Sequence, residues 1–154
     1  MHGVAPRQIL GQSWWNKTRK AAYASTNNHC IACGVHKLKA KHRQWVEGHE
    51  VYLVDYLLGY WEYLETVPLC HFCHNYIHGG RLKILLDKGK ISATKYTMIR
   101  QHGDSVLANA NLSPKAEYPG PFAEWKDWRM ILNGTEYPSL FLSEDEWAIH
   151  YRRC

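Results

Sequence analysis

The chain has 154 residues, of which 45% are hydrophobic and 21% are charged. This length supports one core of ordinary size, so we expect a single domain with an appended tail and exclude a multidomain enzyme. No apolar run could span a bilayer and the first residues do not resemble a secretory signal, so we expect a soluble, cytoplasmic protein without membrane contact. Nineteen Lys and Arg against fourteen Asp and Glu give a net charge of +5, which suits a polyanionic partner but is equally typical of a slightly basic surface.

Two cysteine pairs are the first chemical feature along the chain. Cys30 and Cys33 form one CxxC, and Cys70 and Cys73 form another after 36 intervening residues. In a chain without an export signal, two matched pairs indicate four thiolates around one tetrahedral zinc ion rather than disulfides. Four sulfurs leave no open position on the ion, so the predicted zinc is structural. Gly34 suits the positive φ that the turn around such an ion often needs.

A basic segment, residues 37–43, follows the first cysteine pair and contains Lys39, Lys41 and Arg43. Its position before the next predicted strand would place these side chains beside the site, where they could bind nucleic-acid phosphates. A solvated charged face is an equally good interpretation of the same run. Contacts of this kind carry no base information, so the segment indicates a polyanion and no target sequence.

Two strands joined by a turn are predicted between the cysteine pairs. Residues 46–54 favour a strand, and its alternation places His49 and Glu50 on opposite faces. A turn at residues 55–59 and a second strand at residues 60–67 follow. Two strands and one helix are too small to be stable alone, which gives a physical reason for a zinc ion that joins them.

A helix with two histidines is predicted after the second cysteine pair. His74 and His78 are spaced i, i+4, so a helix places both imidazoles on one face and within reach of one cation, whereas His71 points elsewhere. Histidines at this spacing are more often surface residues than ligands. His49 on the predicted hairpin supplies a third candidate, and the three together indicate a second ion.

The rest of the chain is less informative. Residues 82–91 and 93–102 are predicted as short helices, the second ended by Gly103, and the proline-rich residues 109–121 as a loop.

Tryptophans at three- and four-residue steps predict an amphipathic helix over residues 122–132, closed by residues 133–134. Trp125 and Trp128 are then expected to pack against the core, although stacking on unpaired bases is the alternative. Residues 143–146 resemble a capping box that opens a last short helix.

Together, the first CxxC, residues 47–50 (EGHE) and residues 69–78 (LCHFCHNYIH) resemble the zinc-containing branch of the HNH nucleases. The resemblance runs from about Trp14, including a helix before the first CxxC, to Arg81. It implies an α+β fold with a small ββα-metal core, braced by the four-cysteine zinc and surrounded by helices. On this basis we expect residues 1–92 to form the HNH-like domain with its N-terminal helix. Residues 93–154 are expected as a helical, Trp-rich extension packed on it.

Carried over by position, the resemblance implies that His49, His74 and His78 bind a second divalent cation, Mg²⁺, Mn²⁺, Ni²⁺ or Zn²⁺. Glu50 stands where the family usually has the histidine that acts as general base, so Glu50 is either the base or a metal ligand. A second departure of this sequence from the family pattern is Glu65, which stands where the family typically has an asparagine that ties down the hairpin loop.

Arg81, three residues after His78, is the first candidate to contact the scissile phosphate, because a guanidinium offers two parallel donors. A solvated charge at a helix end is the alternative interpretation of Arg81.

The function implied by the resemblance is a metal-dependent endonuclease that nicks or cuts DNA, with a size that suits a free-standing enzyme of a phage or mobile element. The alternative is a catalytically weak or silent zinc-braced module that binds nucleic acid or a protein partner. The three intact histidines favour the enzyme, whereas Glu50 and Glu65 leave room for the module.

Overall fold

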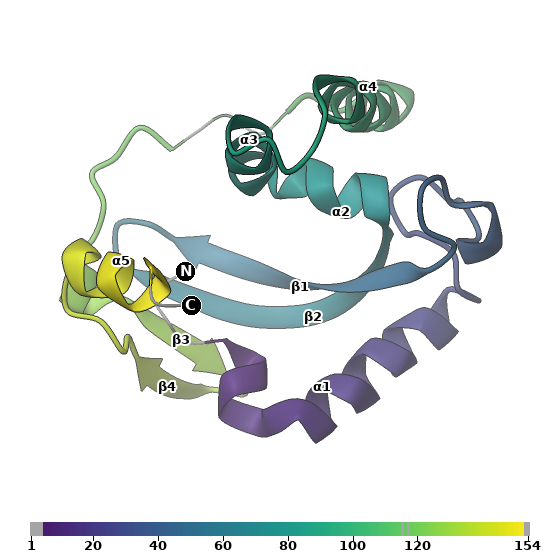
Figure 1. Cartoon of the computed structure of the whole chain (residues 1–154). Coiled ribbons are helices and arrows are strands. Elements are labelled where there is room, and N and C mark those ends of the chain that lie inside the picture. The colour runs from purple at the N-terminus through teal and green to yellow at the C-terminus, as the bar shows by residue number, and fades with distance from the viewer. Residues whose placement is uncertain (1–4, 115, 117, 153–154) are drawn as a thin grey trace. The chain divides into compact units, whose positions relative to one another are not determined.

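The computed structural model describes residues 5–114, 116 and 118–152, and it has a mixed α+β architecture (Figure 1). No helix within the described ranges has the length and apolar character needed to cross a membrane. The elements in chain order are α1 (Pro6–Ser25), η1 (Lys37–Lys39), β1 (Val46–Asp55), β2 (Tyr60–Cys70), α2 (His71–Ile77), α3 (Gly79–Asp87), α4 (Ala93–Asn109), η2 (Trp125–Asp127), β3 (Arg129–Leu132), β4 (Thr135–Pro138) and α5 (Glu144–Arg152).

A four-stranded sheet in the order β1-β2-β3-β4 carries the long hairpin predicted from the sequence. The hairpin turn is fixed by Asp55, whose carboxylate accepts hydrogen bonds from the backbone N–H groups of Leu57 (3.0 Å) and Leu58 (2.8 Å). β3 joins β2 in parallel, with Tyr60 opposite Arg129, and β4 pairs with β3 in the antiparallel sense. β2 extends to Cys70, three residues beyond its predicted end, so the strand leads directly into the second cysteine pair.

The chain divides into two compact units that are interleaved along the sequence. The first unit contains residues 1–18, 50–65 and 117–154, and the second contains residues 19–49 and 66–116. We call the second the metal-ligand unit, because it contains both cysteine pairs and the three candidate histidines. Within it, α2 packs against α3 and α4.

The amphipathic helix predicted over residues 122–132 is wrong. Only one 3-10 turn forms there, and the chain then continues as β3, in which Met130 and Leu132 are buried and their neighbours are less so. Every second residue is therefore buried, as in a strand and not as in a helix. The segment is extended because its backbone groups form hydrogen bonds with β2. Asn133 (φ 51°) and Gly134 (φ 75°) form the two-residue hairpin turn between β3 and β4.

Trp125 and Trp128 lie in and just after the 3-10 turn that precedes β3, and not on one face of a helix. Trp128 is buried, as expected, and Trp125 is half-buried. The segment 93–154, expected to be helical, thus contains two strands as well as α4 and α5.

The sequence analysis predicts that Gly103 ends a helix, and this prediction is wrong. Gly103 lies buried inside α4. A Cβ at this position would meet the ring of Tyr76 at 2.1 Å, so the absence of a side chain lets α4 approach α2. α4 continues to Asn109, and the loop predicted over residues 109–121 is confirmed after it for the described residues, which do not include residues 115 and 117. The last helix also forms, with the Ser143 hydroxyl accepting the N–H of Glu146 (3.2 Å).

Candidate metal centres

The four cysteines of the two CxxC pairs come together in the metal-ligand unit. The first pair lies on a tight turn closed by the hydrogen bond from the Gly34 N–H to the Cys30 carbonyl (2.9 Å), and Gly34 has the predicted positive φ of 70°. The second pair is set by the start of α2, where the sulfur of Cys70 caps the helix by accepting the N–H of Cys73. A hydrogen bond from Ile31 N–H to the Pro68 carbonyl (2.9 Å) joins the two pairs.

The geometry of the four sulfurs fits one zinc ion. All four lie within 4.8 Å of one another, and the sulfurs of Cys33 and Cys70 are 3.8 Å apart. Tetrahedral coordination at about 2.3 Å requires sulfurs about 3.8 Å apart. Hydrogen bonds from Cys30, Cys70 and Cys73 lower the pKa of the Cys33 thiol, whereas the pKa of Cys73 is raised by the thiols around it. Several thiolates at this spacing repel each other, so the group suits a cation such as zinc.

His102 contacts this sulfur group from α4 and was missed by the sequence analysis. Its Nε2 lies 3.3 Å from the sulfur of Cys73 and 4.0 Å from that of Cys70. An imidazole N–H that donates to a ligand sulfur disperses thiolate charge and fixes the ligand's orientation. No local pattern marks this residue, because its position depends on how α4 packs on α2.

The structure also brings the three predicted histidines together. Their ligand nitrogens lie within 4.8 Å of one another, and the Nε2 atoms of His74 and His78 are 3.2 Å apart. His49 on β1 has its ring centre 5.3 Å from that of His74 and 5.0 Å from that of His78. His78 follows the last residue of α2, so the helix ends just before the glycine pair 79–80.

The protonation of these histidines favours cation binding. Burial lowers the pKa of His49 to about 4, with the adjacent His78 and His74 adding to the shift. Burial and the neighbouring His74 and Arg81 charges likewise lower the pKa of His78. Both rings are therefore neutral at pH 7, the form in which imidazole is a metal ligand.

Glu47 is the second side chain whose role the sequence analysis missed. Its carboxylate accepts hydrogen bonds from Nδ1 of His71 (2.9 Å) and from Nδ1 of His74. Burial raises the pKa of Glu47, but the hydrogen bonds from the two histidines outweigh burial and hold the pKa well below its usual range. This arrangement leaves Nε2 of His74 as the free ligand atom, which is the usual way that proteins orient a metal-binding histidine.

Neither Glu50 nor Glu65 belongs to the histidine group among the described residues. Among the described residues, the group of ligand atoms within 4.8 Å contains His49, His74 and His78 and does not include Glu50. As the next residue along β1, Glu50 projects from the opposite face of the strand, and its charge contributes to the raised pKa of Tyr52, whose main cause is burial. Glu65 is exposed on β2.

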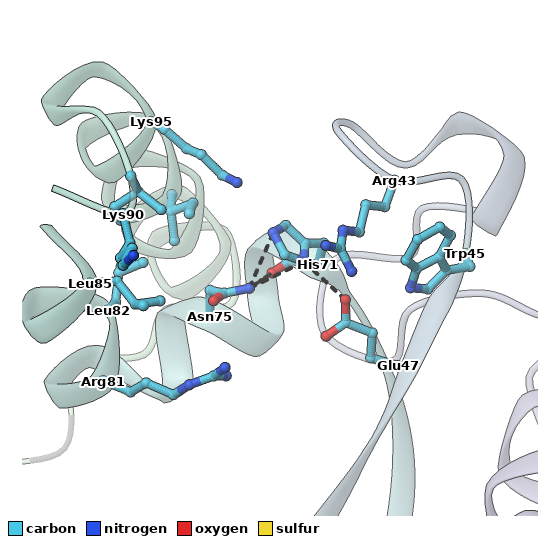
Figure 2. Close-up of a pocket in the computed structure, with 12 residues that line it drawn as sticks. Arg43, Trp45, Glu47, His71, Asn75, Arg81, Leu82, Leu85, Lys90 and Lys95 are labelled. Carbon is cyan, nitrogen blue, oxygen red and sulfur yellow. Dashed lines mark hydrogen bonds and ion pairs between the residues drawn. The ribbon is translucent and has the colours of Figure 1, made fainter. Parts of the chain in front are cut away.

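The predicted phosphate-binding residues separate into two groups. Lys39 and Lys41 are exposed and do not line the neighbouring pocket. Arg43 and Arg81 do line it, together with Glu47 and His71 (Figure 2). The pocket has a volume of about 450 Å³ and belongs wholly to the metal-ligand unit.

No protein-family model matches the sequence, and neither a curated protein nor a solved structure is significantly similar to it. The site is therefore defined by its own geometry: a four-cysteine group that could hold zinc and a separate group of three histidines.

Proposed function

We propose that this chain is a metal-dependent endonuclease of the HNH type that hydrolyses phosphodiester bonds of DNA. The observation that carries the proposal is the meeting of His49, His74 and His78 at ligand distance in the same unit as a complete four-cysteine group. A structural zinc needs only the cysteines, so the additional three-histidine group indicates a second ion with a different role.

The chemistry expected at the histidine group depends on its open coordination. Three imidazoles leave positions for substrate, and a divalent cation there would stabilise the charge that develops on a leaving 3′ oxygen. Glu47 holds His74 in orientation through Nδ1. Arg81 acts on His78 electrostatically and lines the adjoining pocket, so its guanidinium is available to a phosphate oxygen.

Two side chains are candidates to accept the proton of the attacking water. Glu50 occupies the position that the family resemblance assigns to the base, but it projects from the opposite face of β1. His71 is buried with Nδ1 bonded to Glu47, an arrangement in which a carboxylate fixes the tautomer and the orientation of an imidazole. We therefore favour His71 over Glu50 as the base.

One observation favours the alternative function, a silent zinc-braced module that binds nucleic acid or a protein. Glu50 lies outside the histidine group, so the residue that the family resemblance assigns to catalysis does not take part in it. A module of this kind would retain zinc and bind its partner without cleaving it.

The test is conversion of supercoiled plasmid to open circle by the full chain in Mg²⁺ or Mn²⁺. We expect nicking by the wild type that EDTA stops, and loss of nicking in His49→Ala with zinc content and fold retained. His150→Ala, a histidine of α5 in the other unit, is the matched control and should nick normally. Absence of nicking by folded, zinc-loaded wild type with either ion would overturn the nuclease in favour of the module.

A further inference from the structure

The pocket beside the histidine group is a cleft with walls of different chemistry (Figure 2). His71 and Asn75 of α2 form its floor. Arg43 and Trp45, in the segment that leads into β1, form one side. The opposite side is contributed by α3, α4 and the residues between them. Its apolar members are Leu85 and Ile91, which are partly exposed, and Leu82 and Ile99, which are buried.

The charges on the cleft favour an anion. Its described lining contains four cationic side chains, Arg43, Arg81, Lys90 and Lys95, and one carboxylate, Glu47. The carboxylate is already engaged by two histidines, so little negative charge remains to repel a phosphate. Cations on both sides of the cleft would hold a phosphodiester strand that passes between them.

The apolar side and the tryptophan distinguish this cleft from a simple phosphate-binding surface. Trp45 is 47% exposed, although large aromatic side chains are usually buried, and the guanidinium of Arg43 lies 4.8 Å over its ring. Contacts to a paired duplex backbone would use the cations but would have no use for a concave apolar wall. The volume of about 450 Å³ falls in the range of small-molecule pockets, about 300–1,000 Å³.

We propose that this cleft binds one unpaired nucleotide of the DNA strand, with the base against Trp45 and the apolar wall and the flanking phosphates on Arg81 and the two lysines. The inference rests on the proposed function for its DNA partner and adds the substrate class. Strands with unpaired nucleotides bind better than a fully paired duplex, because a base must leave its pair to enter the cleft.

The proposal is tested by measuring the affinity of the full zinc-loaded chain for labelled oligonucleotides by fluorescence anisotropy. No divalent cation is added, so that no cleavage occurs. The probes are a short single strand, the same strand with abasic sites, and its fully paired duplex. We expect the single strand to bind about ten-fold more tightly than the abasic strand, because stacking on an aromatic side chain contributes this much per base. Equal affinities for the intact and abasic strands, or tighter binding of the duplex, would overturn the proposal.

Two variants locate the binding in the cleft. Trp45→Ala should remove most of the difference between intact and abasic strands. Lys90→Ala should weaken binding and reduce the dependence of log affinity on log salt by about 0.7 for one lost phosphate contact. Lys88→Ala is the matched control, since it removes the same charge two residues earlier at a position outside the lining. Equal effects of Lys88→Ala and Lys90→Ala would show a diffuse charge effect and contradict the proposal.

Failure of this inference and failure of the nuclease are separable. Nicking without any base-dependent binding would retain the nuclease and remove the nucleotide cleft. Base-dependent binding without nicking would support the cleft and the silent module.

Discussion

Glu47 connects the two parts of the candidate site through one carboxylate. Its oxygens bind Nδ1 of His71, which lines the cleft, and Nδ1 of His74, which belongs to the histidine group. Because both hydrogen bonds go to the charged form, they hold the pKa of Glu47 low despite burial. A change at this one position should therefore affect metal binding without touching a ligand atom.

Glu47→Gln should lower the affinity of the histidine group for Mn²⁺ or Ni²⁺ by about 10- to 100-fold, as the loss of an orienting carboxylate does in metal sites generally. The amide keeps the shape of the side chain but cannot accept hydrogen bonds from both imidazoles at full strength. Isothermal titration of zinc-loaded protein measures this affinity.

The matched control for this measurement is Glu50→Gln, three residues along the same strand. Its side chain lies on the other face of β1, so the affinity should change less than about two-fold. A loss as large as that of Glu47→Gln would make Glu50 a ligand and contradict the geometry.

At the level of elements, the packing of α4 on α2 determines what surrounds the metal ligands. Gly103 admits the ring of Tyr76, and this ring is further held by the Arg100 guanidinium, 4.7 Å from its centre, and by a hydrogen bond from its hydroxyl to Asp104 (2.7 Å). The same helix supplies His102 to the sulfur group. The close approach of these helices therefore also positions a contact to the cysteine sulfurs.

Gly103→Ala should lower the free energy of unfolding by about 1–3 kcal/mol, the usual cost of overpacking. The added methyl would overlap ring atoms near the Tyr76 Cβ, which cannot move aside without shifting the helix. This cost outweighs the gain of about 1 kcal/mol that alanine brings to a helix interior. Urea unfolding of zinc-loaded protein followed by circular dichroism measures the change.

Gly80→Ala in α3 is the control, because a Cβ there meets nothing within 4 Å. It should leave stability unchanged or raise it by up to about 1 kcal/mol. Equal destabilisation by the two substitutions would contradict a specific contact between α2 and α4.

For the whole molecule, the four-cysteine group brings together parts of the metal-ligand unit that are far apart in sequence. It links the turn after α1 to the end of β2 and the start of α2, across the 36 residues between the cysteine pairs. Binding of a structural zinc supplies about 10–16 kcal/mol, which is as large as the total stability of an ordinary domain. The fold of this unit should accordingly depend on the metal.

The wild type should retain about one zinc per chain after dialysis. Cys70→Ser should lose this zinc together with much of the helical signal, whereas His49→Ala should keep both. Zinc content by atomic absorption and far-ultraviolet circular dichroism provide the two readings. The matched control is Cys154→Ser, the fifth cysteine, which lies outside the described residues and outside both CxxC pairs. A folded Cys70→Ser protein without zinc would contradict the structural role.

Short-range patterns carried most of what could be predicted about the candidate site. The CxxC spacing, the i, i+4 histidines and the alternation around His49 depend on backbone geometry within a few residues, and the ligand sets they suggested are the ones that come together. The same patterns led to the hairpin and to the helix after it.

Only the tertiary structure decided features that depend on distant partners. Residues 129–132 form a strand because β2 is beside them to pair with, although their own spacing suits a helix equally well. Glu47 and His102 gained their roles from side chains 24 to 32 residues away. The cleft exists because α3, α4 and the segment before β1 converge over α2. The sequence by itself thus determined which residues could bind metal, whereas long-range packing decided what surrounds them, because local spacing contains no information about contacts between distant segments.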